Sequence, residues 1–232
     1  NTERIPCLTI FSAPNTSKIT EGSVGKSVIT KKQMIDSGYH DVRSLLEHVA
    51  GIDVYSDGPQ GQKTSIFMRG TNSNHTLVLL NGVAINDQSA TNGMHDFGQD
   101  FLQTVQQVEV YKGSNGSLFG PDAIGGAINF VTDADYTNKL NINGYNLKNN
   151  SFDYNTTKIT SNDWHLNLKG AVNQSNSNSA KAKGGENDGS KNYQVNLNGN
   201  KWISNELKFK STFYYRDTKT DYDKSDTQEE SV

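Results

Sequence analysis

The sequence predicts a mixed α/β domain followed by a series of antiparallel β-strands. Up to about residue 132, helical and strand patterns alternate, as they do in a compact α/β unit. Beyond that point, apolar and polar residues alternate with a period of two through several segments. The chain is also polar: only 33% of its 232 residues are hydrophobic and the mean hydropathy is −0.70, which is low for a water-soluble globule of this size.

The N-terminal part contains one helical pattern and several strand patterns. Asp41 is a predicted N-cap, the apolar residues at 42, 45, 46 and 49 share one helical face, and Gly51 is a predicted C-terminal stop. Ile52 and Val54 begin a strand. Residues 105–113 and 127–132 predict further strands, joined by a tight connection at 121–126.

Five segments after residue 132 alternate with a period of two. Each has one apolar or aromatic face and one face of Asn, Lys and other polar residues; they lie at 140–143, 152–160, 164–172, 193–200 and 207–215. Two interpretations are open: a water-soluble antiparallel sheet with one hydrated face, or transmembrane barrel strands with the apolar face toward lipid. Alternations of about nine to eleven residues, aromatic residues near strand ends and unequal connections favour the barrel.

The composition excludes several classes of protein. The net charge is −3 and there is no basic run, so we expect no nucleic-acid partner. The single Cys7 cannot form an internal disulfide. No stretch approaches the eighteen or so apolar residues of a transmembrane helix. The five histidines have no Cys or Ser nucleophile context, so we expect no enzyme.

Three ordered motifs resemble the plug domain of TonB-dependent outer-membrane receptors. They are VRSLLEHVAGIDV (42–54), SIFMRGTNSNHTLVLLNGVAIN (65–86) and VQQVEVYKGSNGSLFGPDAIGGAINFVT (105–132). The resemblance is strong over residues 28–132 and loose over the strands that follow. It implies an N-terminal extension at 1–27, a plug at 28–132 and the first strands of a transmembrane barrel at 133–232, in a family whose barrel has about 22 strands. It also implies the outer membrane of a Gram-negative bacterium, with the strands facing its lipid.

The sequence departs from the family pattern at several places. Ala50 replaces the usual Pro, Lys112 replaces the usual Arg before Gly, and Asn81-Gly82 replaces the usual Asp-Gly turn. About 100 residues follow the plug, enough for about five strands. A barrel of that size would leave two unpaired edges in lipid, so we expect an N-terminal part of a longer receptor or a truncated gene product.

The resemblance implies active import across the outer membrane, with energy coupled through TonB and its inner-membrane complex. Residues 69–83 are most similar to family members that transport cobalamin (vitamin B12). One alternative is a ferric-siderophore or haem receptor. An alternative of another class is a β-rich surface binding module that does not transport, which would be soluble without detergent.

Two segments that follow plug strands, a first loop at 55–65 and a second loop at 86–97, resemble the loops that contact ligand in the family. Their amide and hydroxyl groups offer adaptable hydrogen bonds to cobalamin or another large metal chelate. The alternative is turns without a ligand role. The candidate residues are Asp57, Gln60, Gln62, Thr64, Ser65, Asn86, Ser89, Ala90, Thr91 and Asn92.

Arg69 directly follows three apolar residues, where a charge needs a partner. In the family, two basic plug residues face carboxylates on the barrel wall and hold the plug in place. Those positions fall on Arg69 and Lys112 here, with Glu109 nearby, and we call them the plug lock. The alternative is an ion pair between Arg69 and Glu109 inside the plug.

Two further sets of residues follow from the resemblance. Glu186 and Asp188 in the long connection, with Asp221 and Asp223 near the C-terminal end, are candidate oxygen ligands for Ca²⁺; the alternative is solvated acidic loops. Near the N-terminal end lies a candidate TonB box, a short extended segment that adds as a strand to its partner. It comprises Leu8, Thr9 and Ile10, and the alternative is a tail remnant.

Overall fold

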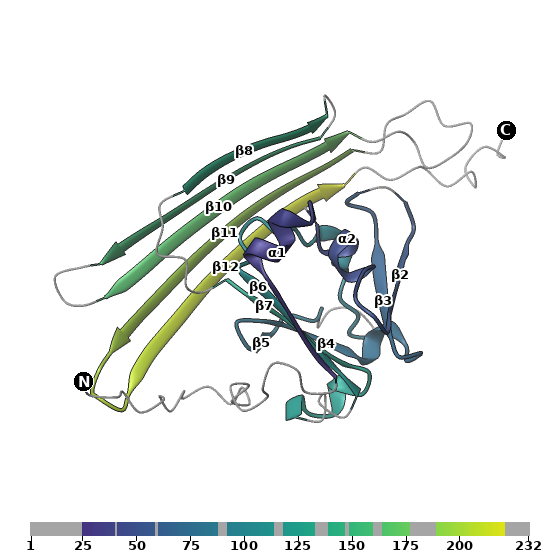
Figure 1. The fold of residues 1–232 in the computed structure, drawn as a ribbon, viewed down its shortest axis with the longest axis horizontal. Coiled ribbons are helices and arrows are strands. Elements are labelled where there is room, and N and C mark those ends of the chain that lie inside the picture. The colour runs from purple at the N-terminus through teal and green to yellow at the C-terminus, as the bar shows by residue number, and fades with distance from the viewer. Residues whose placement is uncertain are drawn as a thin grey trace, which may run out of the picture.

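The computed structural model describes residues 25–39, 41–58, 60–87, 92–113, 118–132, 139–146, 149–159, 164–176 and 189–220. The elements form two parts (Figure 1). The first, which we call the plug, runs from β1 (Lys26–Thr30) to β7 (Gly126–Val131). The second, which we call the wall sheet, contains β8 to β12 and lies along one side of the plug. None of the helices in the described ranges is both long and apolar enough to cross a membrane.

A five-stranded mixed sheet forms the centre of the plug. Its strand order is β1–β6–β7–β4–β5. β6 (Gln107–Lys112) is antiparallel to β1 and β7, whereas β7 is parallel to β4 (Thr76–Leu80). A tight turn joins β4 to the antiparallel β5 (Val83–Ala84). Its central residues Asn81 and Gly82 have φ angles of 51° and 86°, as a type I′ turn requires, so the predicted turn is confirmed.

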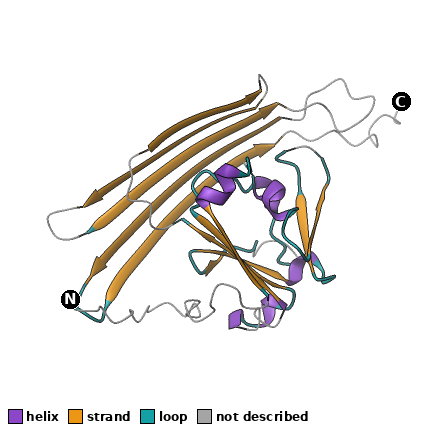
Figure 2. Cartoon of the chain, viewed as in Figure 1, coloured by secondary structure: helices purple, strands orange, loops and turns teal. Residues whose placement is uncertain are grey.

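Helices and a hairpin pack on one face of this sheet. The hairpin consists of β2 (Ile52–Ser56) and β3 (Thr64–Met68), which form a separate antiparallel pair. Figure 2 shows the helices, in purple, gathered on the plug. One apolar cluster joins side chains of the helices at 31–36 and 42–46, the hairpin and the sheet, among them Met34, Leu45, Ile66, Val108 and Ile128. Burial of these side chains is what holds the layers together.

Both α-helices are short and begin at caps. α2 (Val42–Leu46) begins after Asp41, whose Oδ1 accepts a hydrogen bond from the Ser44 amide at 2.7 Å, which confirms the predicted N-cap. It ends five residues before the predicted stop at Gly51. α1 (Lys31–Asp36) was not predicted, although Thr30 and Gln33 form a capping box and have the sequence spacing that is typical of this motif. The 3-10 helices are η2 (Ser73–His75), η3 (Phe97–Gln99) and η5 (Pro121–Ala123).

All five period-two segments form strands of the wall sheet. They are β8 (Lys139–Asn146), β9 (Asn149–Ile159), β10 (His165–Asn176), β11 (Gly189–Trp202) and β12 (Lys208–Thr220). Each is antiparallel to the next along the chain, in the order β12–β11–β10–β9–β8. In the described part of the chain, β8 and β12 are the two edges, so the sheet is open.

The polar face of the wall sheet is the one that meets the plug. On β10 and β11, Lys169 is 2% exposed and Asn196 is fully buried, whereas Leu168 is 41% exposed and Leu197 also 41%. A water-soluble sheet packs its apolar face on a core and leaves its polar face in water. The arrangement here is the opposite and matches strands that turn their apolar face to lipid. Of the two interpretations of the alternation, the structure therefore supports the barrel.

Candidate functional site

The two loops predicted to contact ligand lie next to each other. The Asp96 carboxylate joins them: its Oδ1 accepts hydrogen bonds from the backbone amides of Thr64 and Gly98, both at 3.0 Å. Gly98 makes this approach possible, because a Cβ there would overlap the carbonyl oxygen of Gln62. Sequence reasoning did not select Asp96. Its position just before η3, where Asp is a favoured cap, was the available signal.

The first loop lies against one end of the wall sheet. The Gln60 carbonyl accepts a hydrogen bond from the Ser190 hydroxyl at 3.3 Å, and the Gly61 carbonyl accepts one from Thr220 at 3.3 Å. Ser190 is near the start of β11 and Thr220 ends β12. At their other ends these strands are joined by the short turn at 203–207. The loops are therefore at the end of the sheet opposite that turn (Figure 1).

Three candidate ligand residues of the first loop have side chains available at its surface or rim. Asp57 is exposed, and Ser65 and Gln60 are half-buried. The Gln60 amide donates to Asp41 Oδ2 at 3.4 Å. Gln62 and Thr64 are buried, with exposed fractions of 6% and 1%.

Two candidate residues hold the loops from inside. The Thr64 hydroxyl lies 3.1 Å from that of Ser56 and 3.0 Å from the Gln62 carbonyl oxygen. In the second loop, Asn86 Oδ1 accepts from the Val78 amide at 2.7 Å. Its Nδ2 donates to the carbonyls of Thr76 at 3.2 Å and Gly93 at 3.0 Å. Asn92 is exposed, whereas Ser89, Ala90 and Thr91 lie outside the described residues.

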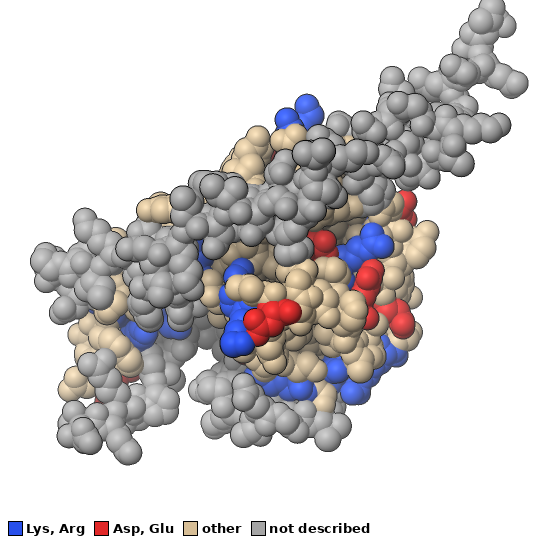
Figure 3. Space-filling view, turned by 45° about the horizontal axis from the view of Figure 1, so that its top comes forward, with Lys and Arg blue, Asp and Glu red and all other residues tan. Residues whose placement is uncertain are grey.

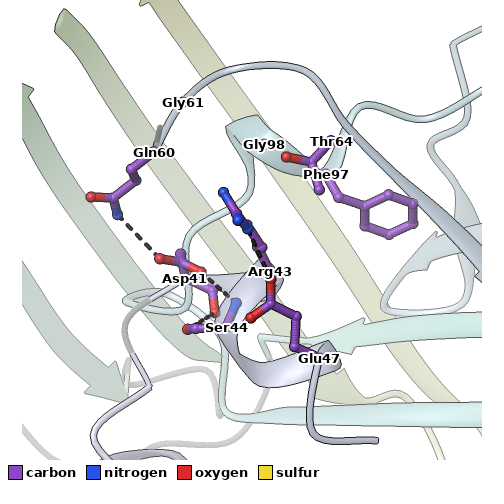
Figure 4. A pocket seen from close by; sticks show the side chains of 9 residues that line it. All are labelled: Asp41, Arg43, Ser44, Glu47, Gln60, Gly61, Thr64, Phe97 and Gly98. Carbon is purple, nitrogen blue, oxygen red and sulfur yellow. Dashed lines mark hydrogen bonds and ion pairs between the residues drawn. The ribbon is translucent and has the colours of Figure 1, made fainter. Parts of the chain in front are cut away.

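A cavity of about 240 Å³ opens between α2 and the first loop (Figure 4). Two of its charged side chains are paired, since Arg43 Nε lies 3.0 Å from Glu47 Oε1. The Arg43 guanidinium also donates to the Gly58 carbonyl at 3.1 Å. This volume is below the usual range for small-molecule sites, so the cavity by itself is too small to enclose a chelate as large as cobalamin. The lining residues are Asp41, Arg43, Ser44, Glu47, Gln60, Gly61, Thr64, Phe97 and Gly98.

Arg69 and Lys112, the two basic residues of the predicted plug lock, come together around Gly51. A Cβ at Gly51 would lie 3.9 Å from Lys112 Cδ and 4.0 Å from Arg69 Cγ. Arg69 has a φ of 51°, which is uncommon for a residue with a side chain, and its amide donates to the Gly51 carbonyl at 3.0 Å. Its guanidinium lies over Gly113, where a Cβ would overlap it. Lys112 Nζ donates to the Ala50 carbonyl at 2.9 Å.

Arg69 is exposed in the described structure, and the base of the β2–β3 hairpin that it follows points away from the wall sheet (Figure 1). Acidic and basic side chains both occur on the plug face shown in Figure 3. Among the described residues, no carboxylate forms an ion pair with the Arg69 guanidinium. The Arg69 guanidinium is therefore accessible to a partner on the side of the plug that faces away from the wall sheet.

Glu109 is held by other partners than Arg69. Its ion pair is with Lys26, whose Nζ lies 3.6 Å from Oε1. The alternative prediction of an Arg69–Glu109 pair inside the plug is therefore wrong, because β1 brings a nearer cation to β6. Three more groups donate to the Glu109 carboxylate: Tyr111 at 2.9 Å, Asn129 at 2.9 Å and Gln107 at 3.0 Å.

Sequence reasoning missed the contacts between plug and wall sheet. Thr132, at the end of the plug, accepts hydrogen bonds at its hydroxyl from Asn81 at 2.8 Å and Asn196 at 2.9 Å. Its carbonyl accepts one from the buried Lys169 at 2.5 Å. The period-two pattern indicated that β10 and β11 have a polar face, but a pattern within one strand does not identify what that face contacts.

Some predicted sites lie outside the described residues. These are the TonB box Leu8, Thr9 and Ile10, and the calcium candidates Glu186, Asp188, Asp221 and Asp223. Within the described ranges, no group of three or more His, Cys, Asp or Glu residues is placed to hold a metal ion.

Comparison of the sequence with known families identifies the α/β part. Residues 18–127 match the TonB-dependent receptor plug domain. The vitamin B12 transporter BtuB of Photobacterium profundum is 41% identical over 106 residues, which are 46% of this chain and 17% of that protein. The chain thus spans about a sixth of the length of this relative.

Solved structures of the same fold cover the wall sheet as well. The siderophore receptor PirA from Acinetobacter baumannii matches 93% of this chain and 34% of its own, with a TM-score of 0.68 and 18% identity. The ferric citrate transporter FecA matches 90% of this chain and 33% of its own, with a TM-score of 0.70 and 15% identity. At these identities the likeness concerns the fold alone.

Family and fold agree with the geometry of the two parts. TonB-dependent receptors are outer-membrane proteins of Gram-negative bacteria, and they are transporters rather than enzymes. The plug found here has the family's mixed sheet, and the strands beside it turn their polar face inward. Residues 18–127 of this chain are therefore a TonB-dependent receptor plug domain.

Proposed function

We propose that this chain supplies the plug and the first wall strands of a receptor that binds cobalamin and imports it with energy coupled through TonB. The proposal that cobalamin is the substrate rests on the 41% sequence identity to a vitamin B12 transporter over 106 residues.

The position of the two loops supports a role in ligand binding. Outer-membrane barrels have short turns on the periplasmic side and longer loops outside. The turn at 203–207 is therefore periplasmic, and the first and second loops lie at the extracellular end of β11 and β12. A ligand that arrives from outside meets them first.

The candidate ligand residues divide into two roles. Asp57 and Asn92 are exposed and Ser65 lies at the rim, so these side chains contact the ligand directly. Gln62, Thr64 and Asn86 are held by the loops themselves and set their shape. Gln60, Ser89, Ala90 and Thr91 complete the proposed binding surface.

The other proposed components follow the same model. Arg69 and Lys112 face carboxylates on the far wall of the complete barrel and lock the plug. Leu8, Thr9 and Ile10 form the TonB box. Ca²⁺ is bound by Glu186, Asp188, Asp221 and Asp223 and orders the outer loops, because carboxylate oxygens suit this cation.

Ligand titration tests the proposed substrate and two of the contacts. In the complete receptor, cyanocobalamin should bind saturably. Asp57→Ala and Asn92→Ala should each weaken the affinity about fivefold, the effect of losing a hydrogen bond of about 1 kcal/mol. The matched control is Asp53→Ala, which removes an exposed carboxylate from β2. Saturable binding of a ferric siderophore without binding of cobalamin would show that the siderophore alternative is right.

A further inference from the structure

A buried carboxylate, Asp100, connects the plug to β12 of the wall sheet. It directly follows η3, and its Oδ2 lies 2.6 Å from Nε2 of His95. Its Oδ1 is paired with the guanidinium of Arg216 on β12. The Asp100 side chain is 8% exposed, that of His95 3% and that of Arg216 23%. The contact thus joins residues 116 apart in the chain, across the boundary between plug and wall sheet.

The three side chains depend on one another. A buried carboxylate needs opposite charges or hydrogen-bond donors, and removing one partner leaves an uncompensated charge. His95 has a second contact, since its Nδ1 lies 3.4 Å from the Ile85 carbonyl oxygen. The ring therefore spans from Asp100 to the residue that precedes the second loop. A change at Asp100 reaches both β12 and the base of that loop.

Neighbouring contacts place Arg216 on the plug side of β12. Tyr214, two residues earlier, packs against the main apolar cluster of the plug. Thr218, two residues later, accepts a hydrogen bond from Asn192 at 2.6 Å. The side chains of Phe213 and Tyr215 are 60% and 53% exposed on the opposite face. Arg216 is thus one of the inward residues of the strand.

We propose that Asp100 is an anchor that holds the plug to the wall sheet, with Arg216 as its wall partner and His95 as a positioning residue. Its polarity is the reverse of the plug lock, because here the acid belongs to the plug and the cation to the wall. With both the plug lock and the Asp100–Arg216 pair in place, the plug stays in position. It can move away from the wall sheet only after the Asp100–Arg216 pair separates. The anchor requires only that the plug lies against the wall sheet. It involves no ligand, so it does not depend on the proposed substrate.

A buried reporter in the wall sheet measures whether the plug stays seated. Ala171 faces the plug from β10 and is 3% exposed. In the complete receptor, in outer-membrane vesicles, Ala171→Cys is combined with Cys7→Ser and with replacement of any other cysteine. The rate at which a maleimide labels residue 171 then reports displacement of the plug.

Asp100→Asn and Arg216→Gln should each raise this rate about tenfold, and the double variant should raise it no further, because both changes break one contact. Glu47→Gln, which removes the ion pair between Arg43 of α2 and the residue that follows this helix, should leave the rate unchanged. Labelling no faster than in this control, or single effects that multiply in the double variant, would overturn the anchor. Arg216→Lys keeps the cation and should stay within about threefold of the parent. If the other variants fail to assemble, labelling of Arg216→Lys well beyond that limit would itself overturn the proposal.

Discussion

At the scale of single residues, Arg69 shows how a charge can be set in place before its partner is present. Its backbone takes a left-handed conformation, and Gly113 leaves the space that the guanidinium occupies. Glu109, which the sequence suggested as a partner of Arg69 inside the plug, is paired with Lys26 instead. Arg suits a contact to wall carboxylates because its planar guanidinium can bind two of them and stays charged.

Replacing Arg69 should therefore loosen the plug without removing the ligand site. In the complete receptor, Arg69→Ala should raise single-channel conductance in planar bilayers severalfold, while cobalamin affinity stays nearly unchanged. Lys32→Ala, which removes an exposed cation paired within α1, is the control. Loss of ligand binding without a rise in conductance would assign Arg69 to the binding surface instead.

At the scale of elements, the two loops are positioned by one carboxylate and one glycine. Asp96 accepts hydrogen bonds from the amide of Thr64 in the first loop and from that of Gly98, just after the second loop. Gly98 also allows the backbone of η3 to approach Gln62. Outside β2, β3 and η3, the described residues of the two loops form no regular secondary structure, so these contacts determine their relative position.

Gly98→Ala should separate the two loops, because the added methyl group would overlap the Gln62 carbonyl oxygen and force the backbone apart. We expect a cost of about 1–3 kcal/mol, as for other overpacked sites. Hydrogen exchange measured by mass spectrometry should be faster in peptides that cover 57–64 and 92–98. The control is Gly170→Ala on β10, where a Cβ would lie 3.9 Å from its nearest neighbour. Exchange in those peptides that matches this control would contradict the role given to Gly98.

At the scale of the whole molecule, the two parts have opposite surface requirements. The plug buries its own apolar clusters under helices and a hairpin. The wall sheet leaves Leu168, Val195, Leu197 and Phe213 exposed on its outer face, and β8 and β12 form its edges in the described structure. Such a surface and such edges favour association in water.

The two parts should accordingly behave differently when separated. Residues 28–132 alone should be soluble, with both helix and strand signals in circular dichroism. The 232-residue chain should aggregate in water and remain dispersed only in detergent. A monodisperse, folded 232-residue chain without detergent would favour the surface binding module over the transporter.

The sequence by itself determined the features that depend on neighbouring residues. Alternation with a period of two predicted all five strands of the wall sheet, Asn81-Gly82 predicted the turn after β4, and Asp41 predicted the cap of α2. Each of these follows from backbone geometry within a few residues. The plug motifs likewise indicated the family, since their order and spacing lie in the chain itself.

Only the tertiary structure decided which surfaces and charges meet. A period of two shows that a strand has two faces, but the position of the plug decides that Lys169 and Asn196 are on the buried one. The partner of Glu109 is Lys26 and that of Asp100 is Arg216, each distant in the chain. Ion pairs and burial depend on distances in space, which local patterns do not contain. For the same reason the meeting of the two loops at Asp96 became visible only once the chain was folded.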